Sequence, residues 1–318
     1  MTAKRSGSTP FEFVYRQDLH VLPASTAANE INLHGGFAPD RRPGSGYIFY
    51  GMPGSGILRI DPDLKRQELI HLPEKLEPLN FHSTKLGIID GEMRLFLPAN
   101  NDSLVAVIDL EGNLDFTLSR PEFEQYRDEA VPYAPTDVVQ VDDRLYIADG
   151  YGANYITSAD INSHHWSGIF GGKTESPIEN GKFGTAHGIT THPEDHHLLM
   201  IADRPNSRMQ SHGLDGSFTA SFGLPPGSWP CGIDYLYHEK RWLGVIGSLL
   251  DPVKDRPAPI YIVDAASYQV ISTIRPEEEL GIEPIQHLHN VVWHVHAGQL
   301  FLVCQSWNPG YYFVLEQV

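Results

Sequence analysis

Residues 186–203 read AHGITTHPEDHHLLMIAD. The segment starts at a polar anchor, His187, and runs through an apolar strand, a turn and a second apolar strand that ends at Asp203. Short apolar runs rich in β-branched residues and bounded by turn formers are typical of antiparallel strands. The same pattern recurs along the chain at a regular spacing, which indicates an internal repeat.

Six copies of this repeat can be laid out over the chain. Their anchors, spaced 44 to 58 residues apart, are His34, His82, Thr136, His187, Cys231 and His289. Their second strands end 13 to 18 residues after the anchors, at Gly51, Asn100, Asp149, Asp203, Gly247 and Gln305. Each interval has room for four short strands, and repeats of four-stranded sheets in this length range build β-propellers.

The repeat therefore predicts an all-β fold, a six-bladed β-propeller in which four-stranded antiparallel blades surround a central channel. Long helical periodicity is nearly absent, and turn dipeptides such as Asp90-Gly91 fall between the apolar runs. We expect residues 1–318 to form a single domain. The opening segment 11–22 precedes the first anchor, and we expect it to add a strand to the last blade near residues 311–315 and so close the ring.

Composition and charge narrow the range of partners. The chain has 318 residues, 41% of them hydrophobic and 20% charged, which fits a globular protein rather than a disordered one. The net charge of −17 argues against nucleic acid or an anionic membrane as main partner, because both select basic faces. No apolar run suits a membrane span or a secretory signal, and only Cys231 and Cys304 are present. We expect a cytoplasmic protein with a small-molecule substrate; its oligomeric state is not predicted.

Four of the six anchors are histidines, and three of them alternate around the ring. His82, His187 and His289 belong to the second, fourth and sixth copies, so a sixfold ring points them at one axis. Three imidazoles with an open position are the pattern of catalytic zinc, although iron, cobalt or manganese would fit the same ligands. The alternative is an empty polar channel. His287 competes with His289 for the ligand role, because residues two apart share a strand face.

Three motifs resemble a known family. They are Ala148-Asp149-Gly150-Tyr151, Ala186-His187-Gly188-Ile189 and the segment 201–210, IADRPNSRMQ. Together they look like the lyase part of the peptidylglycine amidating enzyme, a member of the NHL-repeat propellers. The resemblance is sharp over about residues 134–220, and the spacing of the histidine anchors extends it around the ring.

The resemblance implies roles for single residues. In that family a metal held by three histidines binds the hydroxyl of an α-hydroxyglycine unit, a tyrosine acts as base, and arginines flank the site as a carbon–nitrogen bond breaks. The matching positions are His82, His187 and His289 for the metal, Tyr151 for the base and Arg204 for an arginine. We expect His34, Asp149 and Asp203 to contact the substrate.

Departures from the family pattern concern the substrate. No arginine stands near residues 50–53, where the family has one in its first blade, and the family's disulfides and copper domain are absent from this sequence. A peptide-hormone substrate is therefore disfavoured. The family's structural calcium uses an acidic residue after the last metal histidine; here Asn290 stands there, and calcium stays open.

The leading hypothesis is a metal-dependent lyase acting on a small hydroxylated or carbinol-type metabolite, with Tyr151 as general base and Arg204 as its electrostatic partner. A hydratase or hydrolase with the same metal is one alternative. A non-catalytic propeller that binds a protein partner is another, and a gluconolactonase-type calcium enzyme is a minor one. The segments 155–181 and 249–259 are interpreted as insertions, either lids or interaction loops. The segment 51–56, GMPGSG, lacks the lysine and helix of a phosphate-binding loop.

Overall fold

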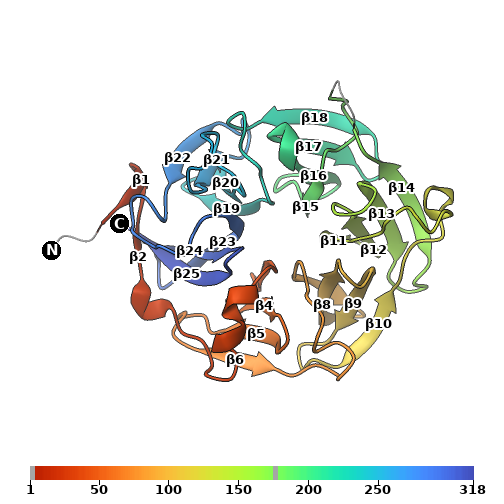
Figure 1. The fold of residues 1–318 in the computed structure, drawn as a ribbon, viewed down its shortest axis with the longest axis horizontal. Helices are drawn as coiled ribbons and strands as arrows, with labels where there is room; N and C mark the ends of the chain where they lie inside the picture. Colours follow the sequence, from red (N-terminus) through yellow and green to blue (C-terminus); the bar gives the residue numbers. More distant parts are fainter. Residues whose placement is uncertain (1–3, 175–177) are drawn as a thin grey trace.

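The computed structural model describes residues 4–174 and 178–318 and confirms the predicted fold class. Six antiparallel sheets stand in a ring, each with its first strand innermost (Figure 1). Nearly all regular structure is strand, interrupted only by short 3-10 turns. Among the described residues no helix is long and apolar enough to cross a membrane.

The first three blades follow the chain in order from the inner to the outer strand. Blade one holds β3 (Phe37–Pro39), β4 (Ile48–Met52), β5 (Gly56–Ile60) and β6 (Gln67–Ile70). Blade two holds β7 (Lys85–Ile89), β8 (Glu92–Ala99), β9 (Leu104–Ile108) and β10 (Leu114–Leu118). Blade three holds β11 (Asp137–Val141), β12 (Arg144–Ala148), β13 (Tyr155–Asp160) and β14 (Trp166–Gly171).

The remaining blades complete the ring. Blade four holds β15 (Ala186–Thr191), β16 (Leu198–Asp203), β17 (Arg208–Gly213) and β18 (Phe218–Gly223). Blade five holds β19 (Asp234–His238), β20 (Arg241–Gly247), β21 (Ile260–Asp264) and β22 (Val270–Ile274). Blade six holds β23 (Leu288–His296), β24 (Gln299–Ser306), β25 (Tyr311–Gln317), β2 (Phe11–Tyr15) and β1 (Ser6–Ser8).

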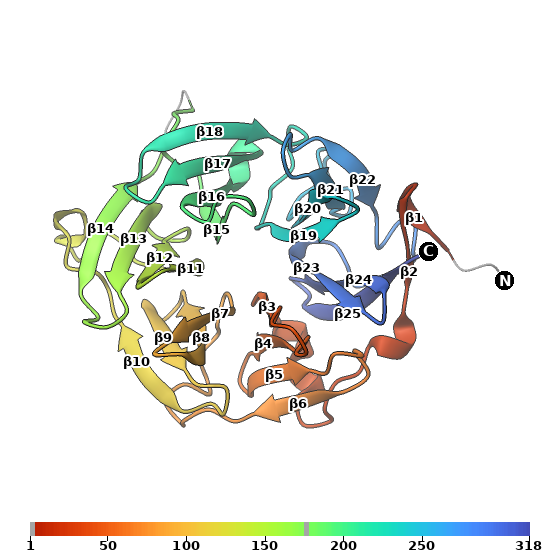
Figure 2. The ribbon, with the colours of Figure 1, turned by 180° about the vertical axis from the view of Figure 1, so that it is seen from behind.

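The two ends of the chain close the ring, as the sequence predicts. Strand β2 pairs antiparallel with β25, with Phe13 opposite Gln317 and Tyr15 opposite Leu315. Both views place β1 and β2 beside the C-terminal strands of the last blade (Figure 2). Because the last sheet joins both termini, opening the ring requires breaking a β-ladder.

Apolar clusters between neighbouring blades hold the ring together. Between blades two and three, Phe96 and Val107 pack in one cluster with Leu145 and Ile147, and all four are fully buried. Each such side chain contributes about 1.5–3 kcal/mol through its removal from water. The channel axis is therefore surrounded by rigid strands, and side chains at their inner ends are held in fixed positions.

One predicted insertion is wrong and one is confirmed as a loop. Residues 155–171 of the supposed insertion 155–181 are the regular strands β13 and β14 with their turn, and 175–177 lie outside the described residues. Residues 248–259 do form a long β20–β21 connection, held by an ion pair between Asp251 and Arg275 at 2.8 Å. The segment 51–56 spans the end of β4, the turn at 53–55 and the first residue of β5.

Candidate metal centre

All four histidine anchors converge on the channel axis at one end of the ring. Each lies at or just before the first strand of its blade, so the four side chains lie at a similar level along the channel axis. The His82 ring centroid lies 4.4 Å from that of His34 and 4.7 Å from those of His187 and His289. Their side chains are buried, between 1% and 8% exposed.

Two of these histidines have a defined tautomer. The Nδ1 atoms of His82 and His187 lie 2.6 and 2.5 Å from the carbonyl oxygens of Thr136 and Cys231. A carbonyl oxygen only accepts hydrogen bonds, so each Nδ1 carries the hydrogen and each Nε2 keeps a lone pair. Burial lowers the pKa of both imidazoles well below 6.5, which keeps them neutral.

The two nitrogens that keep a lone pair lie close together. His187 Nε2 lies 3.2 Å from His82 Nε2. Two nitrogens bound tetrahedrally to one zinc at about 2.0–2.1 Å would be about 3.3–3.4 Å apart. Without a cation between them, two neutral acceptors at this distance repel, so the pair fits a shared metal ion.

Local backbone irregularities aim two of the histidines. The β15–β16 pairing skips register between Ala186 and Ile189, and the β23–β24 pairing skips between Leu288 and Asn290. His187 and His289 therefore lie in bulges, which turn a side chain out of the regular alternation. A Cβ on Gly188 would come within 2.4 Å of the Cys231 carbonyl oxygen, so only glycine lets the blades approach closely enough for the His187 hydrogen bond.

His289 provides an independent sign of a missing ligand. It is 2% exposed, and neither ring nitrogen has a hydrogen-bond partner in the described structure. Leaving a buried polar group unpaired costs about 1–3 kcal/mol, so such groups are normally satisfied. The nitrogens of His34, His82 and His289 lie within 4.8 Å of one another, a group that could hold a metal ion; among the described residues this group includes His34, which the sequence did not predict as a ligand, and does not include the predicted ligand His187. The residues present therefore fit a bound metal.

Tyr151 stands at the edge of this group. Its hydroxyl lies 3.3 Å from His187 Nε2 and accepts a hydrogen bond from Arg204 Nη1 at 2.8 Å. The residue is 38% exposed, so a molecule entering the channel mouth can reach it. Burial raises the pKa of Tyr151 and Arg204 lowers it, with burial the larger effect. The charge of Arg204 therefore does not outweigh burial in setting the pKa of Tyr151.

Arg204 is a buried cation that makes no ion pair among the described residues. It is 3% exposed, its Nη2 lies 3.1 Å from Cys231 Sγ, and its Nε has no partner. None of the salt bridges between described residues includes it. A charge removed from water without a counter-ion is costly, so it favours negative charge on Tyr151, on Cys231 or on a bound molecule.

Asp149 and Asp203 lie in the turns that carry the two residues just described, and their contact with a substrate stays a prediction. Both are fully buried. Asp149 accepts hydrogen bonds from Tyr126 Oη, Ala134 N and Ala153 N, each at 2.6 Å, and so fixes the turn that carries Tyr151. Burial raises the pKa of Asp149 to about 6.

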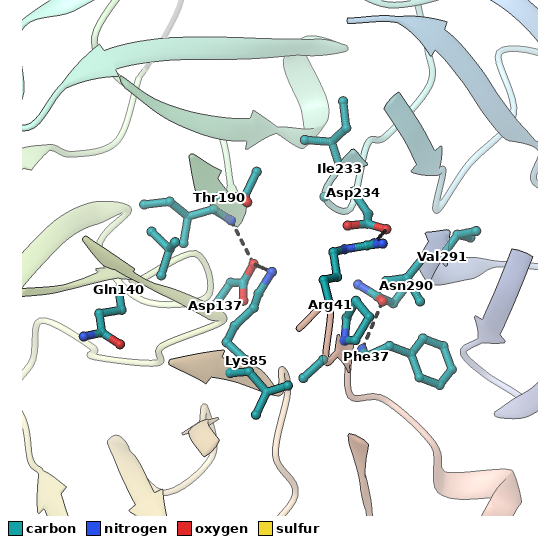
Figure 3. A pocket seen from close by; sticks show the side chains of 17 residues that line it. Phe37, Arg41, Lys85, Asp137, Gln140, Thr190, Ile233, Asp234, Asn290 and Val291 are labelled. Carbon is teal, nitrogen blue, oxygen red and sulfur yellow. Dashed lines mark hydrogen bonds and ion pairs between the residues drawn. The ribbon is translucent and has the colours of Figure 1, made fainter. Parts of the chain in front are cut away.

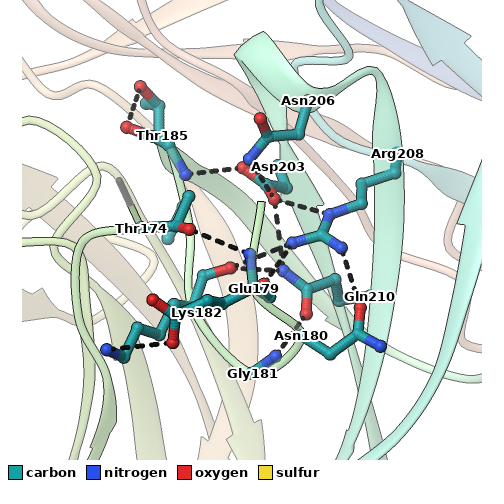
Figure 4. A network of polar contacts seen from close by, with 12 residues as sticks. Thr174, Glu179, Asn180, Gly181, Lys182, Thr185, Asp203, Asn206, Arg208 and Gln210 are labelled. Atoms are coloured by element: carbon teal, nitrogen blue, oxygen red, sulfur yellow. Dashed lines mark hydrogen bonds and ion pairs between the residues drawn. The ribbon is translucent and has the colours of Figure 1, made fainter. Parts of the chain in front are cut away.

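Asp203 fixes the turn that carries Arg204. It pairs with Arg208 at 2.8 Å and accepts hydrogen bonds from Asn206, Gln210 and the Gly184 backbone (Figure 4). The Ala-Asp-Arg motif is thus a structural aspartate followed by a site arginine. The sequence could not separate these roles, because both residues are polar and adjacent at a strand end.

Further along the same axis lies a polar cavity of about 210 Å³ (Figure 3). Its carboxylates are already paired, Asp137 with Lys85 and Asp234 with Arg41. Asn290 Oδ1 accepts a hydrogen bond from the Phe37 backbone at 3.0 Å. With these oxygens engaged, the cavity offers no ready ligand set for the calcium that the sequence left open.

The structure also separates His287 from the site and adds residues that the sequence missed. His287 Nδ1 bonds the Leu249 carbonyl at 2.8 Å, and the residue is not in the three-histidine group. Cys231, noted only as an anchor, contacts Arg204, and Trp307 stacks on His34 with ring centroids 5.3 Å apart. Neither contact has a local sequence signal, because each joins residues of two different blades.

No family model matches this chain, and no curated protein matches it in sequence. The resemblance to the amidating lyase therefore stays a prediction. Solved structures match the fold. A gluconolactonase from Xanthomonas campestris has a TM-score of 0.60 at 10% identity, covering 99% of this chain and 94% of that one.

Two further structures show the same likeness. Virginiamycin B lyase from Staphylococcus aureus has a TM-score of 0.54 at 13% identity, covering 91% of this chain and 96% of that one. The Cps50 (Swd1) propeller domain of Myceliophteria thermophila has a TM-score of 0.55 at 12% identity, covering 90% and 84%. At these identities the neighbours establish that the chain has a β-propeller fold and do not assign an activity.

Proposed function

We propose that this protein is a metal-dependent lyase acting on a small hydroxylated or carbinol-type molecule. The observation that carries the proposal is a pair of short distances. His82 Nε2 lies 3.2 Å from His187 Nε2, and the Tyr151 hydroxyl lies 3.3 Å from His187 Nε2. A metal site and an ionisable hydroxyl in contact are what abstraction of a hydroxyl proton requires.

A bound divalent ion would supply Lewis acidity, lowering the pKa of a substrate hydroxyl and stabilising its developing negative charge. Tyr151, as phenolate, takes the hydroxyl proton. The carbinol carbon then forms its carbonyl as the bond to its nitrogen or other heteroatom breaks, and the electron pair leaves with that heteroatom, which takes the proton back from Tyr151. Arg204 donates to the Tyr151 oxygen and favours its ionised form.

Room for a substrate exists beside the histidine group. A pocket of about 330 Å³ borders His34 and is lined by Leu33, Pro53, Asn80 and Trp307. No charged side chain lines it, which favours a neutral molecule with some apolar surface. This fits a small metabolite better than a charged peptide terminus.

The proposal is tested with untagged protein reconstituted with zinc, iron, cobalt or manganese and a panel of carbinolamides and hydroxylated metabolites. Mass spectrometry in ¹⁸O-water follows the products. Cleavage that leaves the new carbonyl oxygen derived from substrate in the earliest product supports a lyase. Incorporation of one solvent oxygen during turnover, above the exchange measured for the isolated product, would instead indicate a hydratase or hydrolase.

A further inference from the structure

His34 lies in the histidine group although it belongs to the first blade, whereas the predicted ligands belong to the second, fourth and sixth blades. Its ring centroid lies 4.4 Å from that of His82 and 4.6 Å from that of His289. We propose that His34 is a fourth protein ligand of the metal ion held by His82, His187 and His289. The inference rests on the proposed function only in requiring that a metal occupies this end of the channel.

The distances within the group of His34, His82 and His289 need only a small adjustment. Two nitrogens bound to one ion at about 2.1 Å lie between about 3 and 4.2 Å apart, depending on the angle between the bonds. The nitrogens of His34, His82 and His289 already lie within 4.8 Å of one another. A few tenths of an ångström per side chain, within the range of small rotations, brings all three into one coordination sphere.

The hydrogen-bonding partner of His34 suits a ligand. Asn80 Nδ2 lies 3.3 Å from His34 Nδ1, while the buried Asn80 Oδ1 has no partner. Turning this amide by half a turn lets Oδ1 accept from Nδ1–H and leaves His34 Nε2 with a lone pair. That is the arrangement already present in His82 and His187, whose Nδ1 atoms bond carbonyl oxygens.

The blades also surround the ion more completely with four ligands. His289, His34 and His82 come from the adjacent blades six, one and two, and His187 comes from blade four across the channel. No carboxylate belongs to the group of His34, His82 and His289 among the described residues. A substrate oxygen would then occupy a fifth position, which favours a metal that accepts five or six ligands.

The rival role for His34 is the substrate contact expected from the sequence. Its ring stacks on Trp307 at 5.3 Å and borders the 330 Å³ pocket, so it could instead face a bound molecule. The two roles predict different coordination of the metal before any substrate is added, because only a ligand bonds the ion directly. A measurement on the metal alone therefore separates them.

The experiment titrates cobalt(II) into chelator-treated, untagged protein and records the visible absorption band and the dissociation constant. X-ray absorption counts the imidazoles around the bound ion. For His34→Ala we expect at least about a tenfold weaker dissociation constant, a changed band and three imidazoles, against four in the wild type. His71→Ala, which removes an exposed imidazole far from the channel, should leave all three readouts unchanged.

Equal affinity, an identical band and three imidazoles in both wild type and His34→Ala would overturn the inference while leaving the metal-dependent lyase intact. Failure of the wild type to bind any metal would overturn both. Circular dichroism and the unfolding midpoint of each metal-free variant check that the propeller is folded. His34→Gln, which keeps a polar side chain of similar reach, should resemble His34→Ala in the imidazole count.

Discussion

His82 and His187 are separated by 105 residues, yet their Nε2 atoms lie 3.2 Å apart, each with its lone pair directed into the channel by a backbone carbonyl on the opposite ring nitrogen. The carbonyls belong to Thr136 and Cys231, the anchors of the next blades. The repeat thus supplies both the ligand and the group that orients it. This relationship connects the fold to a site that attracts a cation.

The metal-free protein should lose stability as the pH falls below about 6.5. Burial lowers the pKa of His82, His187 and His289 well below 6.5 and that of His34 to about 4. The unfolded chain binds more protons in this window, so the stabilisation is fully present above about pH 6.5 and is lost towards pH 4. Unfolding midpoints measured from pH 4 to 8 check this.

The double variant His82→Gln, His187→Gln is the control for this dependence of the unfolding midpoint on pH. It removes two groups that must stay neutral in the folded state, so its midpoint should fall less steeply over the same pH range. An equal slope in the wild type and the double variant would show that other groups govern acid unfolding. Asp149 acts in the opposite direction, because its pKa is raised to about 6.

Tyr151→Phe should lower kcat by about 10² to 10⁴-fold while leaving the metal content unchanged, because it removes the proton acceptor and keeps the ring. Turnover and elemental analysis of the same preparation measure both. Tyr237→Phe, an exposed tyrosine, is the matched control and should keep full activity. A Tyr151→Phe variant as active as wild type would exclude the tyrosine as base.

Arg204→Gln should shift the rising limb of the pH–rate profile to higher pH. Activity needs the Tyr151 phenolate, and the Arg204 charge lowers the pKa of that hydroxyl across their 2.8 Å hydrogen bond. Arg204→Lys keeps the charge and should shift the limb less. Identical limbs in all three proteins would mean that Arg204 acts only in packing.

Asp203→Ala should destabilise the protein by about 3–5 kcal/mol, since it leaves the buried guanidinium of Arg208 without its partner. Thermal unfolding should show a midpoint lower by at least about 5 °C. Glu124→Ala breaks an exposed ion pair with Arg127 and should leave the midpoint unchanged. Similar midpoints for the two variants would contradict the structural role given to Asp203.

The sequence predicted the ring well, because the repeat is set by strand spacing and by anchors that recur in every blade. It also pointed to His82, His187 and His289, since alternate blades face one axis. The same rule placed His34 away from the ligands, although its ring centroid lies 4.4 Å from that of His82 and 4.6 Å from that of His289. The position of a blade in the ring predicts the direction from which its anchor faces the channel axis. It does not predict how far the side chain lies from that axis.

Other parts of the site depend on contacts that no local pattern encodes. Asp149 and Asp203 read as site residues because they end strands beside Tyr151 and Arg204, yet both are saturated by neighbouring backbone and side chains. Cys231 reaches Arg204 from a different blade. Such roles follow from burial and packing between repeats, which the amino-acid sequence specifies only through the complete fold.

Elemental analysis of untagged wild type, His82→Ala, His187→Ala and His289→Ala tests the central claim most directly. After incubation with zinc, iron, cobalt or manganese and removal of free ions, we predict about one transition metal per wild-type chain and loss of it in each variant. His71→Ala should retain it. A folded wild-type protein that binds none of these metals, or variants that all retain it, would contradict the account.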